Sequence, residues 1–495
     1  MDDGSAEHGY RPAQRFGLIL GGVAFSIMLV LPAPAGLGHE GWRTAAVAVL
    51  MAVWWMTEAL PIPATALLPL ALFPALGVLS APDASAPYAN ELIFLFMGGF
   101  LIAVTMEKWG LHKRIALRIM SMVGTSPNRL VLGFMLATAF LSMWISNTAT
   151  AAMMLPIALA VGEMFRPQDA DDGVYQFGVA LMLGVAYAAS LGGVATLIGT
   201  PPNAVLAGAA SEMLGRQIGF MEWMGVGLPV SLFMIPIAWL LLTRILYPPG
   251  DLHGDAASIL EAERASLGPP TRGEKLTGAV FALTALAWVL RAEKHFGGVT
   301  IPGLQTFMPD IRDSTIAMTA AVVLFLLPTG PVRKGSFCLD WKTARRIPWG
   351  VLVLFGGGLS LAVAMDRSGL AGWIGGVVSS LSSVPIWVVV AAVATLIVFL
   401  TELTSNVATT SMAMPIMAGA AAGLGVEPEL LMTTAALAAS MAFMLPVATP
   451  PNAIVFSSGY LTIPQMSRAG ILLNLTAIVV ITICSEMLIP YFLLS

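Results

Sequence analysis

The chain has 495 residues, of which 57% are hydrophobic and only 11% are charged, with a mean hydropathy of +0.84. Soluble domains carry about 25% charged residues, so this composition excludes an ordinary soluble protein. The formal net charge of −4 is small and spread along the chain, which gives no basis for a nucleic-acid partner. Cys338, Cys484 and five scattered histidines lack the spacing of a disulfide framework or a metal site.

Apolar runs of about 17–25 residues recur along the chain, as is typical of helices that cross a membrane. We predict an all-α polytopic membrane protein with about 11 transmembrane helices. Alternating strand patterns are absent, which disfavours an outer-membrane barrel. The expected spans are 16–34, 42–60, 62–80, 90–108, 176–212 (broken), 222–247, 276–291, 314–328, 349–367, 430–458 (broken) and 469–494.

The first span has a second interpretation. Arg11 and Arg15 precede an apolar run from Phe16 to Leu31, and small residues follow at 33–35, as they do at a signal-peptide cleavage site. The distribution of charge along the chain favours a retained first helix instead.

Positive charge gives the orientation of this map. With the N-terminus in the cytoplasm, 18 of the 24 Lys and Arg residues fall on the cytoplasmic side. Because cytoplasmic loops are enriched in Lys and Arg, we predict an inner (plasma) membrane protein with its N-terminus inside and its C-terminus outside. The longest polar loop, 248–275, is then a cytoplasmic linker. The basic residues on the opposite side are Arg43, Arg216, Arg291, Lys294, Arg312 and Arg367.

Two further apolar segments, 128–163 and 385–425, are interrupted near their centres by polar residues. The first contains WISNTATAAMMLP from Trp144, and the second contains TELTSNVATTSMAMP from Thr401. Each segment is long enough for two crossings or for a re-entrant hairpin with the polar break at its tip, and the residues alone leave both possibilities open.

The chain contains an internal repeat. FMGGFLIAVTMEKWGL from Phe96 matches FGGGLSLAVAMDRSGL from Phe355 at eight of 16 positions, with an offset of 259 residues. The same offset carries Ser146 onto Ser405. A second pair, GTPPNAV at 199–205 and ATPPNAI at 448–454, has an offset of 249, and the polar loop RPQDADDGVYQ accounts for the difference.

The matched segments are five crossings apart in this map, so they run in opposite directions. Inverted repeats are typical of secondary transporters, whose binding sites lie near the bilayer midplane between the repeats. A single polar break could be a helix-packing device built from small residues. Four breaks at matched positions favour a binding site, because irregular backbone at this depth is tolerated only when it is buried in protein or lines a cavity.

The breaks offer ligands of two kinds. The proline pairs of both TPPN motifs leave the carbonyls before them without intrahelical donors, and the C-terminal end of a half-helix favours a cation. Hydroxyl and amide oxygens complete a neutral set that suits Na⁺. Each SN motif begins a half-helix whose free N–H groups suit an anion. No Lys or Arg lies in either motif, so bound cations would supply the positive charge, and anion binding would depend on the cation.

With these motifs the chain resembles the divalent anion/sodium symporter family of dicarboxylate, citrate and sulfate carriers. The resemblance covers almost the whole chain and is most specific in ASMAFMLPVATPPNAIV at 439–455, while SNTAT and SNVATT resemble the paired substrate motifs of the family. It implies a homodimer in which a transport domain moves as an elevator against a fixed scaffold. It also makes 128–163 and 385–425 re-entrant hairpins.

The resemblance assigns individual residues. One Na⁺ site would consist of Ser142, Ser146, Asn147 and Gly199, and the other of Thr401, Thr404, Asn406 and Ala448. The substrate contacts would be Ser146, Asn147, Thr148, Thr200, Pro201, Ser405, Asn406, Val407, Thr449 and Pro450. Val407 departs from the threonine usual at its position and lacks a hydroxyl, which leaves the identity of the substrate open.

The same resemblance divides the chain into fixed and moving parts. The first fixed part includes an interfacial helix at 112–124, where HKRIALRIMSMVG places basic and apolar faces on one helix. In chain order, the expected parts are scaffold 1–127, transport 128–247, linker 248–275, scaffold 276–384 and transport 385–495.

We predict a carrier rather than an enzyme or a channel. It would couple Na⁺ to a small dianion, most simply a C4-dicarboxylate such as succinate, malate or fumarate, and would need no organic cofactor. A membrane-embedded enzyme would need a nucleophile–base pair or metal ligands, and no His lies near any break. A dicarboxylate or citrate exchanger without Na⁺ coupling and a sulfate carrier stay open. The carboxyl of Glu402 is expected to be capped by hairpin backbone or to reach water, with proton coupling as its alternative.

Overall fold

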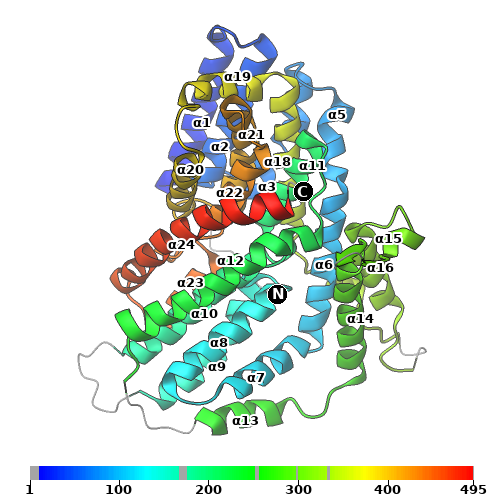
Figure 1. Ribbon diagram of the computed structural model, residues 1–495, viewed down its shortest axis with the longest axis vertical. Helices are drawn as coiled ribbons and strands as arrows, with labels where there is room; N and C mark the ends of the chain where they lie inside the picture. The colour runs from blue at the N-terminus through cyan, green and yellow to red at the C-terminus, as the bar shows by residue number, and fades with distance from the viewer. Residues whose placement is uncertain (1–10, 167–174, 251–255, 297–298, 332–334, 494–495) are drawn as a thin grey trace, which may run out of the picture.

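The computed structural model describes residues 11–166, 175–250, 256–296, 299–331 and 335–493, which are mostly helical (Figure 1). The first half forms α1 (Pro12–Val30), α2 (His39–Thr57), α3 (Ile62–Thr65), α4 (Leu68–Ala75), α5 (Ala81–Ser85), η1 (Ala86–Ala89), α6 (Glu91–Lys108), α7 (Leu111–Val123), α8 (Pro127–Ser142), α9 (Asn147–Met164), α10 (Gln176–Val194), α11 (Pro201–Leu214), α12 (Phe220–Leu240) and its π-helical continuation η2 (Leu241–Leu246).

The remaining elements belong to the linker and the second half of the chain. They are α13 (Ala256–Ser266), α14 (Arg272–Val289), β1 (Lys294–Phe296), β2 (Val299–Ile301), α15 (Leu304–Phe307), α16 (Asp313–Leu326), α17 (Trp341–Ala344), α18 (Trp349–Arg367), α19 (Leu370–Val378), η4 (Ser379–Leu381), α20 (Ile386–Thr401), α21 (Asn406–Leu424), α22 (Pro428–Ala439), α23 (Pro450–Phe456) and α24 (Ile463–Phe492).

Several helices have the length and composition of membrane spans, which confirms the prediction of a polytopic α-helical membrane protein. The number of crossings and the inverted orientation of the repeat stay predictions. Within the described residues, seven helical stretches qualify: Pro12–Val30, Ala81–Lys108, Gln176–Val194, Phe220–Leu246, Trp349–Arg367, Asn406–Leu424 and Ile463–Phe492.

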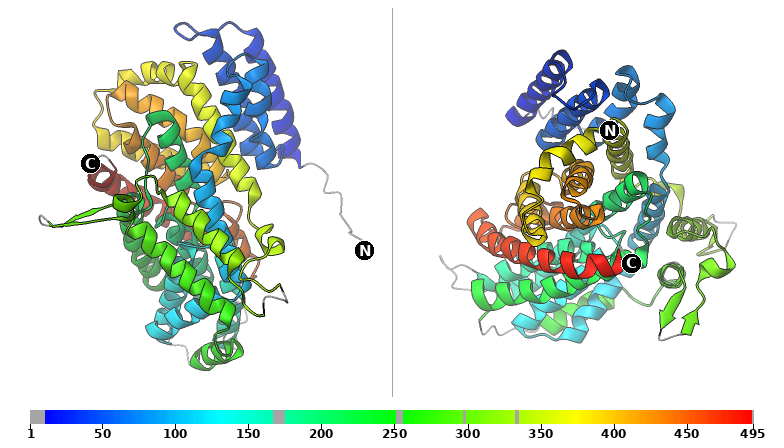
Figure 2. Two further views of the ribbon diagram at one scale, coloured as in Figure 1. Left: turned by 90° about the vertical axis from the view of Figure 1, so that its right-hand side faces the viewer. Right: turned by 45° about the horizontal axis from the view of Figure 1, so that its top comes forward.

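Two segments differ from the prediction. The expected span 62–80 is not one helix, because α3 ends at Thr65, α4 begins at Leu68 directly before Pro69, and α4 ends at Ala75. Proline removes a helical N–H and clashes with the preceding turn, and this segment is rich in proline. The second difference is a short antiparallel pair, β1 and β2, that projects from the helical body where no strand was expected (Figure 2).

All four expected breaks are present, and the two halves of the chain interlock around them. The hairpin α8–α9 is interrupted at 143–146 and the hairpin α20–α21 at 402–405. The broken helix α10 packs on α8, as α22 packs on α20. The short half-helices cross over, because α11 packs on α21 and α22 while α23 packs on α9 and α10. In Figure 1 the first hairpin lies in the lower part of the molecule and the second in the upper part.

The centre of the molecule is helical and buried. Every residue from Phe177 to Val194 of α10 is buried, as expected for a helix that is apolar all round. The last helix, α24, packs on α12 of the first half and on α20 and α22 of the second, and so joins the two groups. The breaks are therefore held inside packed protein.

Helices α19 and α21 approach each other more closely than side chains would permit. A Cβ on Gly375 would lie 2.5 Å from the carbonyl oxygen of Gly419, and a Cβ on Gly419 or Gly423 would clash with the backbone of Ala371 or Gly375. Small residues at a helix interface allow backbones to make direct contact in this way.

Candidate functional site

The first SN tip gathers oxygen atoms around Ser142, which is completely buried. Its hydroxyl oxygen lies 2.5 Å from Asn147 Oδ1 and 2.7 Å from the carbonyl oxygen of Ala189 on α10. Ser146 is the N-cap of α9, where its hydroxyl accepts a hydrogen bond from the backbone N–H of Ala149 at 3.1 Å. The tip thus combines a small cluster of neutral oxygens with the start of a helix.

The second SN tip repeats this arrangement. Thr401 Oγ1 lies 2.8 Å from Asn406 Oδ1 and 2.9 Å from the carbonyl oxygen of Ala439 on α22. A hydroxyl has one hydrogen, so it cannot donate fully to both acceptors. Each tip therefore holds oxygen lone pairs that a monovalent cation can use. Ser405 is the N-cap of α21, as Ser146 is of α9.

Gly193 brings the first TPPN break to the first tip. A Cβ on Gly193 would lie 2.6 Å from Asn147 Oδ1, and a Cβ on Gly199 would clash with the carbonyl oxygen of Gly193. Asn147 and Gly199, two of the expected Na⁺ ligands, therefore both lie against Gly193. In the second half, Ala448 is buried in the segment between α22 and α23.

The asparagine of each TPPN motif holds its break open. Asn203 Nδ2 donates to the carbonyl oxygens of Gly193, Val194 and Thr196, at 3.2, 3.4 and 2.8 Å. Asn452 Nδ2 donates in the same way to the carbonyl oxygens of Ala442 and Leu445, at 3.2 and 3.0 Å. Three of these carbonyls have a second donor: Thr196 accepts from Gly199 N–H at 3.3 Å, Leu445 from Ala448 N–H at 3.2 Å and Val194 from Trp223 Nε1 at 2.9 Å. In each break, the Asn side chain at the start of the second half-helix therefore donates hydrogen bonds to carbonyl oxygens at or after the end of the first.

Glu402 satisfies backbone N–H groups in the break between α22 and α23. Its carboxylate is buried and accepts hydrogen bonds from the backbone N–H groups of Phe443 and Met444 at 2.7 and 2.9 Å. It also accepts from Leu445 N–H at 3.2 Å and from Asn474 Nδ2 of α24 at 2.7 Å. The cap therefore comes from the broken tenth span and from α24, whereas the prediction placed it in the hairpin.

The first half lacks this carboxylate. Met143 stands 259 residues before Glu402, and its carbonyl oxygen accepts a hydrogen bond from Thr196 Oγ1 at 2.5 Å. Both tips are thus tied to the broken helix beside them, but by a hydroxyl in the first half and by a buried carboxyl group in the second.

The other expected site residues differ in exposure. Ser146, Asn147, Ser405, Asn406 and Val407 are half-buried at the tips, Thr200 and Thr449 are buried N-caps of α11 and α23, Pro201 is half-buried, and Thr148 and Pro450 are exposed. Thr404 turns away from Asn406. Its hydroxyl donates to the carbonyl oxygen of Leu400 at 2.9 Å and lies 2.6 Å from Thr409 Oγ1. Val407 packs against the hydrophobic core.

No basic side chain lies in the two SN tips or the two TPPN breaks. The sequence has no Lys or Arg between Arg129 and Arg166, between Arg166 and Arg216, or between Arg367 and Arg468. Among the described residues, no group of three or more His, Cys, Asp and Glu side chains is placed to hold a metal ion. The arrangement therefore offers helix ends, hydroxyls and amides, which suit a singly charged cation and an anion that are bound together.

Sequence reasoning missed several of these groups. The carbonyls of Ala189 and Ala439 carry no signal in a sequence, because every residue has one. Asn203 and Asn452 did carry a signal, since both lie in the repeated TPPN motif, and the rule that buried helix ends need partners would have found them.

The chain resembles known proteins over nearly its whole length. Residues 13–493 match the sequence model of the family described as the sodium:sulfate symporter transmembrane region. A Staphylococcus saprophyticus protein named sodium-dependent dicarboxylate transporter SdcS is 41% identical over 489 residues, which cover 97% of this chain and 92% of that protein. The protein of the same name from Staphylococcus aureus (strain bovine RF122) is 39% identical over 494 residues, or 98% and 93% of the two chains.

A solved structure shows the same fold. The crystal structure of the Alcanivorax borkumensis YdaH transporter superposes with a TM-score of 0.58 and 16% sequence identity, over 97% of each chain. Both the family and these relatives are transporters, which confirms the prediction of a carrier rather than an enzyme. The chain belongs to the sodium:sulfate symporter family, as its resemblance to divalent anion/sodium symporters predicted.

Proposed function

We propose that this protein is a secondary active transporter that couples the entry of Na⁺ to the uptake of a C4-dicarboxylate such as succinate, malate or fumarate. The proposal depends most on the matched oxygen clusters, one around Ser142 and Asn147 and the other around Thr401 and Asn406. Such sets of neutral oxygens at half-helix C-terminal ends are how transporters coordinate Na⁺. Relatives named sodium-dependent dicarboxylate transporters support both the ion and the substrate class.

The dianion would bind where α9 and α21 begin. Both helices start directly after a serine N-cap, and their first N–H groups and the Asn amides are donors for carboxylates. Because basic side chains are absent from these elements, bound Na⁺ would neutralise the dianion. Empty cation sites would then leave the substrate site without positive charge, which makes uptake depend on Na⁺. Thr148, Thr200, Pro201, Val407, Thr449 and Pro450 would line the rest of the site.

The movement would be that of an elevator in a homodimer. Residues 128–247 and 385–495 would move against residues 1–127 and 276–384, with the N-terminus of the chain in the cytoplasm and its C-terminus outside. The crossing-over of α11 and α23 supports a single moving body, because it ties the two hairpins together.

The test is uptake by purified protein in proteoliposomes, with succinate, citrate and sulfate each offered with and without an inward Na⁺ gradient. We expect succinate uptake that needs Na⁺ and is not driven by a proton gradient alone. Sulfate uptake without succinate uptake would show that the substrate is sulfate rather than a dicarboxylate. Succinate counterflow at the same rate in Na⁺ and in K⁺ would show that the protein is an exchanger rather than a Na⁺ symporter.

A further inference from the structure

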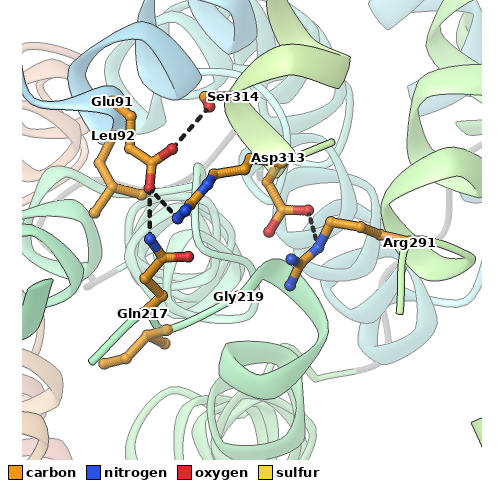
Figure 3. A pocket seen from close by; sticks show the side chains of 9 residues that line it. Glu91, Leu92, Gln217, Gly219, Arg291, Asp313 and Ser314 are labelled. Atoms are coloured by element: carbon orange, nitrogen blue, oxygen red, sulfur yellow. Dashed lines mark hydrogen bonds and ion pairs between the residues drawn. The ribbon is translucent and has the colours of Figure 1, made fainter. Parts of the chain in front are cut away.

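A cluster of polar side chains joins the proposed moving and fixed parts (Figure 3). Glu91 begins α6, Arg291 follows α14, and Arg312 and Asp313 begin α16, all in the proposed scaffold. Gln217 lies between α11 and α12, in the proposed transport domain. We call these five residues the Asp313 cluster.

The inner layer of the cluster is buried. Arg291 Nε lies 2.8 Å from Asp313 Oδ1, and the backbone N–H of Phe220, the first residue of α12, donates to Asp313 Oδ2 at 2.8 Å. Asp313 is 7% exposed. A Cβ on Gly219 would clash with the Arg291 guanidinium, so this glycine lets the two parts approach closely. The Asp313 carboxylate thus binds Arg291 of the proposed scaffold and the first backbone N–H of α12 in the proposed transport domain.

The outer layer faces solvent. Glu91 Oε1 accepts hydrogen bonds from Gln217 Nε2 at 3.0 Å and from Arg312 Nη1 at 2.9 Å. Beside it, Asn90 Nδ2 donates to Glu212 Oε1 of α11 at 2.5 Å. In both bonds, from Gln217 to Glu91 and from Asn90 to Glu212, a residue of α11 or of the loop after it meets the start of α6.

An aromatic stack leads from this cluster to the first SN tip. Trp288 of α14 donates its indole N–H to the carbonyl oxygen of Asp313 at 3.1 Å and stacks on Phe220 with ring centroids 4.6 Å apart. Phe220 stacks in turn on Trp144 at 5.9 Å, and Trp144 meets Phe281 of α14 edge-on at 5.0 Å. Trp144 is two residues before Ser146, so rings from both parts enclose the base of the tip.

We propose that the Asp313 cluster and the stack of Trp288, Phe220 and Trp144 form a latch between the scaffold and the transport domain, which positions the first SN tip and has to open in every transport cycle. Contacts made in one of two states raise the population of that state. The proposal rests on the proposed function, because the latch is meaningful only when the two parts move apart.

A covalent tie across the latch tests whether it opens. In Glu91→Cys/Gln217→Cys protein, a short thiol-reactive cross-linker is expected to abolish succinate uptake in proteoliposomes, and a reducible cross-linker should restore it on reduction. The native thiols of Cys338 and Cys484 are buried, and single-cysteine variants measure any contribution from them. The matched control is Asp83→Cys/Arg367→Cys, which ties an ion pair of 2.9 Å within the scaffold and should leave uptake unchanged.

The two proposals fail in different ways. If wild-type protein takes up no dicarboxylate, the proposed function falls, and the latch is then judged by the rate of cross-linking with and without Na⁺. If wild-type protein transports and the Glu91–Gln217 tie leaves its rate unchanged, the latch is wrong and the function stands.

A second measurement compares cross-linking rates and does not require transport to be blocked. Phe220→Leu and Asp313→Asn should each slow the cross-linking of the 91–217 pair, because they loosen the state in which the two residues meet. Asp83→Asn, which weakens the scaffold pair, should not. Equal cross-linking rates in all three variants and the parent would remove Phe220 and Asp313 from the latch.

Discussion

Asn147 and Asn406, which are 259 residues apart, each place the amide oxygen beside the hydroxyl of the residue five positions earlier, at 2.5 and 2.8 Å. Two tips with so little sequence in common around them, Met143–Ile145 in one and Glu402–Thr404 in the other, still build the same cluster. The shared geometry supports the proposed ligand set over a helix-packing role.

Asn147→Ala and Asn406→Ala should each abolish Na⁺-dependent uptake while the protein still inserts and can be purified. Each change removes an oxygen ligand and leaves a buried hydroxyl with one partner fewer. The measurement is initial uptake of succinate at equal protein. Thr395→Ala is the control, because this exposed hydroxyl of α20 bonds to its own helix. Wild-type uptake by either Asn variant would take the SN motif out of the site.

Gly193→Ala should weaken Na⁺ activation. The added methyl would lie 2.6 Å from Asn147 Oδ1, so the amide has to shift out of the oxygen cluster. We expect the Na⁺ concentration for half-maximal uptake to rise more than the Michaelis constant for succinate at saturating Na⁺. Gly376→Ala on α19 is the matched control, since its Cβ would meet no atom within 4 Å. An unchanged Na⁺ dependence in Gly193→Ala would show that Asn147 is not a cation ligand.

Asn203→Ala should lower the thermal stability of the purified protein as well as its uptake. The substitution removes the amide donor from the buried carbonyls of Gly193, Val194 and Thr196. Val194 keeps the Trp223 indole N–H and Thr196 keeps the Gly199 N–H, so the carbonyl of Gly193 is the one that loses its donor. An unsatisfied buried polar group costs about 1–3 kcal/mol. Thermal unfolding in detergent measures the loss. Thr476→Ala, an exposed position on α24, provides the comparison. Unchanged unfolding would mean that water replaces the amide.

Glu402→Gln should reduce uptake without changing the coupling ion. The glutamine amide turns an NH₂ group toward backbone donors that the carboxylate accepts, so the segment after α22 loses its anchor. The remaining uptake should still require Na⁺ and should not respond to an imposed proton gradient. Should wild-type uptake run on a proton gradient without Na⁺ and vanish in Glu402→Gln, the proton-coupled alternative is correct.

Val407→Thr keeps the volume of the side chain and adds a hydroxyl. A hydrogen bond to a charged group is worth about 1.5–3 kcal/mol, so a carboxylate at this position would raise the affinity for dicarboxylates. Each 1.4 kcal/mol corresponds to about tenfold in affinity. If the valine methyl packs on the carbon skeleton of the substrate, affinity falls and preference shifts instead. Michaelis constants for succinate, citrate and sulfate that all match wild type would place Val407 outside the pocket.

The breaks of the helices could be predicted because they have local causes. Paired prolines in GTPPNAV and ATPPNAI cannot continue a helix, and SN at the centre of an apolar run supplies an N-cap. The repeat then made the two halves equivalent, and the structure confirms the positions of all four breaks. Proline also explains the error at 62–80, where the hydrophobicity of the segment was given more weight than Pro69, which lies directly after the break between α3 and α4.

The contacts between elements could not be predicted. The sequence does not say that α11 packs in the second half and α23 in the first, because this depends on how whole helices pass one another. For the same reason Glu402 could be identified as buried but not matched to Phe443 and Asn474. The prediction of local structure needs neighbouring residues alone, whereas a ligand set needs the complete path of the chain.

Backbone contact at Gly375, Gly419 and Gly423 makes α19 and α21 a single mechanical piece. Helices separated by side chains can slide by small rotamer changes, but sliding here would drive carbonyl oxygens into Cα atoms. In the proposed elevator, a movement of α21 would therefore carry α19 along, so the boundary between the fixed and moving parts would lie before α19 rather than at residue 384. Gly369 there has φ +76°, and Gly110, its counterpart 259 residues earlier before α7, has φ +72°. Both glycines occupy a backbone conformation that other residues rarely adopt, so Gly110→Ala and Gly369→Ala would strain the turns before α7 and α19 and leave the proposed binding residues unchanged.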